Sequence, residues 1–83
     1  MKIIFKLFAS LSDLLPPEAR GNALELEITS KTTIGEILKA QRIPEESAHL
    51  VMVNGVFIAP SERASKTLQE EDELAIWPPV AGG

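Results

Sequence analysis

The chain has 83 residues, a formal net charge of −4 and no cysteine. This length predicts one small domain, and the lack of thiols excludes disulfide bonds and is typical of the reducing cytoplasm. The acidic balance argues against nucleic-acid binding and favours a protein partner with a basic surface, although it could equally serve only to keep the chain soluble. With no signal-peptide pattern and no apolar run of the roughly 20 residues that span a bilayer, we expect a cytoplasmic protein without membrane contact.

The first third of the chain predicts two strands with a loop between them. Residues 2–9 alternate with period two, and the apolar positions of one face are Ile3, Phe5, Leu7 and Ala9. Residues 10–15 predict one or two helical turns that end at Pro16-Pro17. Residues 24–28 alternate again, so we expect a second strand that pairs with the first as a hairpin.

A helix is predicted after the second strand. Thr33 as the N-cap and Glu36 three residues later fit a capping box, and an apolar stripe follows at helical spacing. Gly35 lowers helix propensity by roughly 1 kcal/mol relative to Ala, a cost that close packing on the sheet would explain. Because Pro44 disfavours helical angles at the residue before it, we expect the helix to end near Gln41 or Arg42.

The second half predicts a tight hairpin and a last strand. Asn54-Gly55 separates two apolar runs, residues 50–53 and 56–59, which is typical of a type I′ turn. Residues 73–77 predict the last strand, which we place beside the first, and Leu68 before it is expected to plug the core. One helix and five strands in this order favour a two-layer α+β fold, a mixed sheet packed on one main helix.

Three of the four aromatic side chains share one predicted face. Phe8, Phe57 and Trp77 lie on the strand parity opposite to the core, where Ile4 and Met52 could extend them. A helix covers only one face of such a sheet, so we interpret these aromatic residues as an exposed partner-binding patch. The alternative is a second, minor core beneath the loop of residues 11–20.

The chain closes in a slim arm. We expect residues 1–77 to form the domain and residues 78–83 to form an extended, flexible tail, whose members are Pro78, Pro79, Val80, Ala81, Gly82 and Gly83. Proline holds the chain extended, and two glycines without Cβ atoms fit a slot too narrow for side chains. Six residues at about 3.3–3.6 Å each reach roughly 20 Å. We interpret Gly83 as the reacting group in a partner's active site; an ordinary frayed terminus is the alternative.

The sequence offers no catalytic equipment of its own. His49 is the only histidine, and neither a cysteine nor a glycine-rich phosphate loop accompanies it. The acidic run of residues 69–72 lacks the further ligands that a metal site requires, so we expect a solvated turn there. We therefore expect no bound cofactor and no metal.

The chain as a whole resembles the MoaD/ThiS family of sulfur carriers, ubiquitin-like β-grasp proteins that end in Gly-Gly. The resemblance rests on four segments, the first of them followed by Leu11 and Leu14: Leu7-Phe8-Ala9, Val53-Asn54, Asp72-Glu73-Leu74-Ala75 and Pro78-Pro79-Val80-Ala81-Gly82-Gly83. The proline pair and Val80 favour the MoaD branch, the small subunit of molybdopterin synthase, over the ThiS branch. Trp77 departs from the commonest pattern, since many relatives carry Phe there, and this puts the specific partner in doubt.

The resemblance implies a mechanism and a set of partners. An E1-like, MoeB-type enzyme would use ATP to adenylate Gly83, and a sulfur donor such as a cysteine desulfurase or rhodanese would convert it to a thiocarboxylate. The large, MoaE-type subunit of molybdopterin synthase would take in the tail, and the sulfur would pass to a pterin precursor during molybdenum cofactor biosynthesis. In this scheme the chain donates sulfur but supplies no catalytic group. Phe8, Phe57 and Trp77 fall where MoaD-like proteins place their docking surface.

Several other functions use the same ending. A ubiquitin-like modifier joined to lysine side chains would be activated in the same way. Carriers for thiamine, for tRNA thiolation or for a tungsten cofactor would differ only in their partners. A simple scaffold would not need Gly83 at all.

Overall fold

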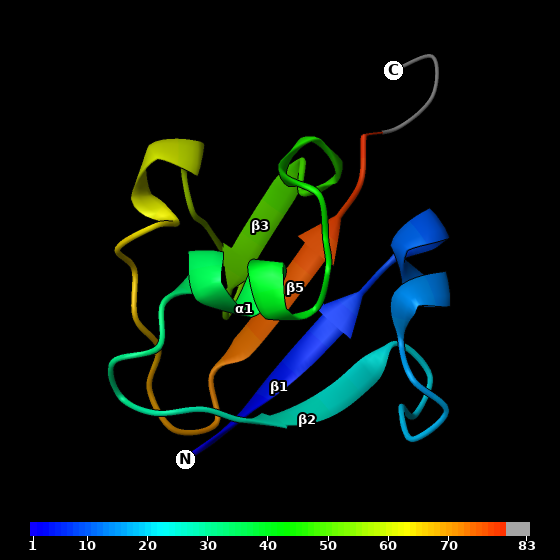
Figure 1. Ribbon diagram of the computed structural model, residues 1–83, viewed down its shortest axis with the longest axis horizontal. Helices are drawn as coiled ribbons and strands as arrows, with labels where there is room; N and C mark the ends of the chain where they lie inside the picture. The colour runs from blue at the N-terminus through cyan, green and yellow to red at the C-terminus, as the bar shows by residue number, and fades with distance from the viewer. Residues whose placement is uncertain (80–83) are drawn as a thin grey trace.

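The computed structural model describes residues 1–79, and its β-strands build one five-stranded sheet with a single α-helix against one face (Figure 1). The elements in chain order are β1 (Lys2–Leu7), β2 (Ala23–Glu27), α1 (Ile34–Ala40), β3 (Leu50–Val53), β4 (Val56–Phe57) and β5 (Glu73–Trp77). Short 3₁₀ helices connect them at Ala9–Leu14, Glu45–Ser47 and Pro60–Glu62.

The strand order in the sheet is β2-β1-β5-β3-β4. β5 pairs in parallel with β1, and the three other pairings are antiparallel, so the sheet is mixed. The last strand therefore lies beside the first, as the sequence predicts, and the expected α+β, β-grasp fold is confirmed. This arrangement places the end of β5, from which the tail leaves, between β1 and β3.

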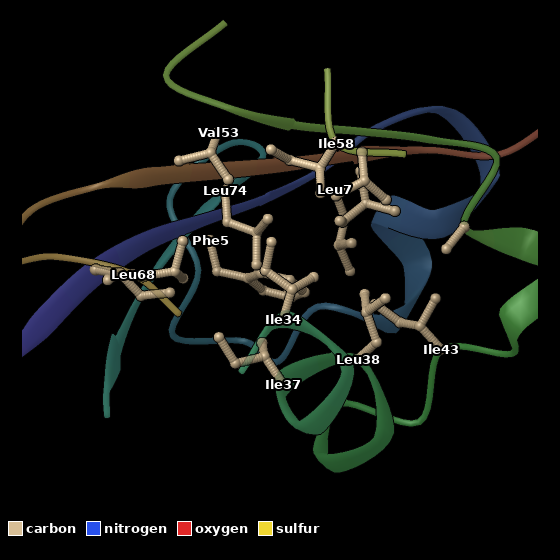
Figure 2. Packing of buried hydrophobic residues seen from close by; sticks show 14 of the residues in the cluster. Phe5, Leu7, Ile34, Ile37, Leu38, Ile43, Val53, Ile58, Leu68 and Leu74 are labelled. Carbon is tan, nitrogen blue, oxygen red and sulfur yellow. The ribbon is translucent and has the colours of Figure 1, made fainter. Parts of the chain in front are cut away.

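The core fills the space between the sheet and α1 (Figure 2). Ile3, Phe5 and Leu7 of β1 are all but fully buried, as the alternation predicts, and so are Leu74 and Ile76 of β5. Helix α1 contributes its apolar stripe from the other side, which removes apolar surface of both layers from water. Leu68, in the loop before β5, is 4% exposed and closes one end of the core as expected.

Helix α1 begins as the capping box predicts. The backbone N–H of Glu36 donates to the Thr33 hydroxyl (3.2 Å), and the Thr33 N–H donates to the Glu36 carboxylate (2.9 Å). Gly35 packs closely, but on the loop after β4 rather than on the sheet: a Cβ there would lie 3.3 Å from the Arg63 oxygen. Within residues 1–79, no helix is long and apolar enough to cross a membrane.

The β3–β4 hairpin has the predicted turn. Asn54 and Gly55 both have positive φ, 51° and 82°, as a type I′ turn requires. The Asn54 amide donates to Asp72 (2.9 Å), and the Glu73 N–H donates back to the Asn54 oxygen (2.9 Å). Asp72 thus ties the hairpin to the start of β5, so the acidic turn is less fully solvated than its sequence predicts.

Two strands are shorter than the sequence predicts. β1 ends at Leu7, because Ala9 has a left-handed φ of 52° and starts a 3₁₀ helix, so Ala9 is exposed and Leu11 enters the core instead. β4 ends at Phe57, and Pro60 begins the next 3₁₀ turn. A single left-handed alanine has no signature in the sequence, since alanine does not favour that conformation.

Candidate functional site: the outer face of the sheet and the root of the tail

The face of the sheet opposite α1 carries a group of apolar side chains. The strand pairings set Ala75 beside Met52 and Met52 beside Phe57, and they set Trp77 beside Leu50. We call these residues, together with Phe8, the outer patch: Phe8, Leu50, Met52, Phe57, Ala75 and Trp77. Figure 1 looks onto the face that α1 covers, so the outer patch lies on the far side of the sheet.

Phe8 and Trp77 meet as a stacked pair. Their ring centroids are 4.4 Å apart and their planes differ by 4°. Phe8 lies one residue beyond β1, and its N–H donates to the Ile76 oxygen (3.1 Å), which holds its ring against the end of β5. Stacking of this kind is worth about 0.5–1.5 kcal/mol beyond the area buried. Both rings are partly exposed, so the pair offers a broad flat surface at the root of the tail.

Phe57 stands apart from this pair and is the more accessible ring. Its side chain is 50% exposed on the two-residue edge strand β4, and Met52 lies beside it. A large aromatic residue kept half in water is the kind of residue that interfaces use as an anchor. Ile4, which could have extended the patch, has Glu73 as its neighbour in the β1–β5 pairing rather than an aromatic residue, and we leave it out of the outer patch.

A charged pair borders the apolar surface. Lys6 lies beside Ala75 in the β1–β5 pairing, and its ammonium group is 3.2 Å from the Glu73 carboxylate. The side chains of Lys6 and Glu73 are 32% and 43% exposed, so water screens this ion pair and it adds little stability. Its position beside the outer patch suits the polar rim of a protein interface.

The residue before the predicted tail, Trp77, is held by a backbone hydrogen bond. The Trp77 carbonyl oxygen accepts a hydrogen bond from the His49 N–H (3.0 Å), and Pro78, which has no N–H, cannot extend the ladder. Pro78, the first residue of the predicted tail, is buried, and Pro79 is exposed. The other predicted tail residues, 80–83, lie outside the described part of the chain, and so does the predicted reacting group on Gly83.

Arg63 is a buried residue that the sequence did not single out. It is 7% exposed, and its guanidinium donates to the carbonyl oxygens of Ile58 (3.2 Å), Ala48 (2.6 Å) and His49 (3.4 Å). Burial lowers the pKa of Arg63 from its ordinary value, and the negative charge of Glu45 opposes that shift. Arginine in a polar stretch is normally exposed, so the sequence carried no signal for this position.

Leu50 was also missed, although the same parity that selects Met52 would have found it. No cluster of three or more His, Asp or Glu side chains that could hold a metal ion is found among residues 1–79. His49 itself is exposed, and it enters the site through its backbone rather than its ring. What the described residues offer is an apolar surface beside the start of the predicted tail, which suits the docking of a partner.

The strand order β2-β1-β5-β3-β4, with one helix against the sheet, defines a small protein of the ubiquitin-like β-grasp class. The model of the ThiS family matches residues 5–83, which is nearly the whole chain. The chain therefore belongs to the ThiS/MoaD family of small sulfur carriers, whose members are activated by E1-like enzymes. Among curated proteins, none matches the sequence.

Solved structures resemble the chain in fold at low sequence identity. SAMP1 from Haloferax volcanii is 24% identical with a TM-score of 0.68, and the match covers 100% of both chains. The HVO 2177 protein of the same organism is 18% identical with a TM-score of 0.77, over 100% of this chain and 87% of that one. A candidate molybdopterin converting factor, subunit 1, from Pyrococcus furiosus is 18% identical with a TM-score of 0.64, and the match covers 95% of this chain and 98% of that one.

Proposed function

We propose that the chain is the sulfur-carrying small subunit of a molybdopterin synthase. The observation that carries this proposal is the ending Pro78-Pro79-Val80-Ala81-Gly82-Gly83, which follows β5 directly at the edge of the outer patch. The proline pair and Val80 resemble the MoaD branch of the family. A partner that docks on the outer patch would receive the tail at the same time.

The reaction at Gly83 divides among the partners. An E1-like enzyme joins the Gly83 carboxylate to the AMP portion of ATP and releases pyrophosphate, which turns a poor leaving group into a good one. A persulfide of the sulfur donor attacks the acyl carbon and expels AMP. A second thiol then reduces the resulting acyl disulfide, and the thiocarboxylate is released. The sulfur of that thiocarboxylate is the nucleophile that the large subunit directs at the pterin precursor.

This chain contributes reach and orientation to the reaction. The six residues of the predicted tail can reach roughly 20 Å when extended, and the last three are Ala and Gly, which carry no bulky side chain. The domain holds the start of that length at Trp77, because the Trp77 oxygen is bonded to His49 and the ring is stacked on Phe8. Fixing one end lowers the conformational entropy that the tail loses when it enters a narrow pocket.

The proposal is tested by supplying the purified chain with ATP, an E1-like enzyme, a persulfide donor and a MoaE-type large subunit with its pterin precursor. Mass spectrometry of the intact chain should find the exchange of one oxygen for sulfur, located at Gly83 by fragmentation, and that sulfur should pass to the pterin. The matched controls are the chain without Gly83 and Gly82→Val, both of which should fold normally and stay unmodified. A wild-type chain that keeps only its carboxylate would contradict the proposal.

A protein modifier is the competing function, since SAMP1, a small archaeal modifier protein, shares the fold. In that case Gly83 would be found in an isopeptide bond to lysine side chains of other proteins. Thiocarboxylate that forms but never reaches a pterin would instead favour a carrier for thiamine, tRNA thiolation or a tungsten cofactor.

A further inference from the structure

Arg63 is held in an unusual way for a buried charge. Within the described residues its guanidinium forms no ion pair, and its partners are three backbone carbonyl oxygens. Buried charges are normally paired with an opposite charge, because desolvation is costly. Here the place of a carboxylate partner is taken by backbone carbonyl oxygens, those of Ala48 and His49 before β3 and that of Ile58 after β4.

One peptide group connects Arg63 to the tail. The Ala48 carbonyl that accepts from Arg63 (2.6 Å) belongs to the same planar unit as the His49 N–H. That N–H donates to the carbonyl oxygen of Trp77 (3.0 Å), the last residue before Pro78. Because the unit is planar, the guanidinium that orients its C=O also orients its N–H. A charged donor on the oxygen also polarises the unit and strengthens the bond on the other side.

Arg63 is itself fixed at its backbone. Its carbonyl oxygen accepts from the Gly35 N–H (2.8 Å) in the first turn of α1, an approach that Gly35 permits because it has no Cβ. The guanidinium then reaches across to the segment before β3. Arg63 thus connects the helix layer to the end of the sheet where the tail begins.

We propose that Arg63 is a positioning residue for the C-terminal tail: through the Ala48–His49 peptide group it fixes the point and direction in which the chain leaves β5. The inference rests on the proposed function only in taking the tail as the reacting arm. Without Arg63, the Trp77 anchor loosens and a partner must order more of the chain when it captures Gly83. The step that suffers is recognition of the tail, not the chemistry at its end.

The test compares two variants. Arg63→Lys keeps the positive charge but loses the planar set of guanidinium donors, and Arg63→Met loses both the charge and the donors. Arg20→Lys is the matched control, because the Arg20 side chain is exposed. The first measurement is amide hydrogen exchange of His49 relative to Asn54, whose N–H bonds to the Glu73 oxygen (2.9 Å) at the far end of the same β3–β5 ladder. The second is the steady-state activation of Gly83 by an E1-like enzyme.

In Arg63→Lys we expect exchange at His49 to rise about 10-fold or more relative to Asn54, and neither amide to change in Arg20→Lys. The KM for activation should rise about 3- to 10-fold with kcat nearly unchanged, the signature of lost binding rather than lost chemistry. Equal acceleration at both amides would mean that Arg63 only stabilises the fold, and unchanged exchange at His49 would mean that it does not hold the anchor. Either result overturns the inference.

Should both variants fail to fold, the wild-type chain still decides. A scalar coupling across the hydrogen bond, from the His49 nitrogen to the Trp77 carbonyl carbon, is expected in its NMR spectrum, and its absence overturns the inference. A wild-type chain that is never activated contradicts the proposed function, whereas the exchange experiment continues to test the anchor.

Discussion

Replacement of Phe57 by Ala separates docking from folding. Half of the Phe57 side chain is exposed, and the residue lies on a two-residue edge strand. An aromatic side chain presents about 200 Å² in all, so about 100 Å² remains to be buried by a partner. At about 25 cal/mol per Å² this area is worth about 2.5 kcal/mol, or about 2 kcal/mol after allowing for the methyl group that Ala retains. The dissociation constant for the large subunit should therefore rise about 30-fold.

The free energy of unfolding should fall by up to about 2 kcal/mol, because the other half of the Phe57 side chain, about 100 Å², is already out of water in the free chain. Val56→Ala is the matched control: Val56 is 64% exposed, precedes Phe57 on the same strand and points to the opposite face. It should leave the affinity unchanged. Isothermal titration with a MoaE-type large subunit gives the affinities, and denaturant unfolding gives the stabilities. Equal losses of affinity in the two variants, or a larger loss in Val56→Ala, would refute the docking surface.

Three further substitutions test the fold and the root of the tail. Thr33→Ala removes the capping box and should lower the free energy of unfolding by about 1 kcal/mol in urea denaturation, without changing partner affinity. Leu68→Ala opens a cavity beneath a 4%-exposed side chain and should cost about 2–5 kcal/mol by the same measurement. Trp77→Asp should weaken partner binding, measured by calorimetry, more than it lowers stability, because the Trp77 ring is partly exposed in the free chain; a larger loss of stability would assign Trp77 to the core.

The fold was predictable where each residue's local preference agrees with its place in the sheet. Alternation in β1 and β5, the capping box at Thr33 and the Asn54-Gly55 turn each depend on neighbours in sequence, and each is found. Ala9 shows the limit of such reasoning. Its alternation fits a longer β1, but the chain turns away there with a positive φ so that Leu11 can reach the core. That gain depends on the whole packing and not on local preference.

The site was predictable to a smaller extent. Strand parity identified the face that carries Phe57 and Trp77, because period two needs no tertiary information. The contact between Phe8 and Trp77 required the parallel β1–β5 register, which brings residues 69 positions apart into one stack. Arg63 could not be found at all, since its partners are carbonyl oxygens and every residue type carries one.

The position of β5 suits the domain to hold the start of the proposed tail. β5 is paired on both edges, with β1 and β3, and its residues Leu74 and Ile76 are fully buried on the side of α1. On the other face Ala75 is 6% exposed beneath its neighbours. A strand held on both edges thus ends at Trp77, immediately before the predicted tail. The conformational freedom of Trp77 is therefore lost during folding, and the binding of a partner does not have to restrict it again.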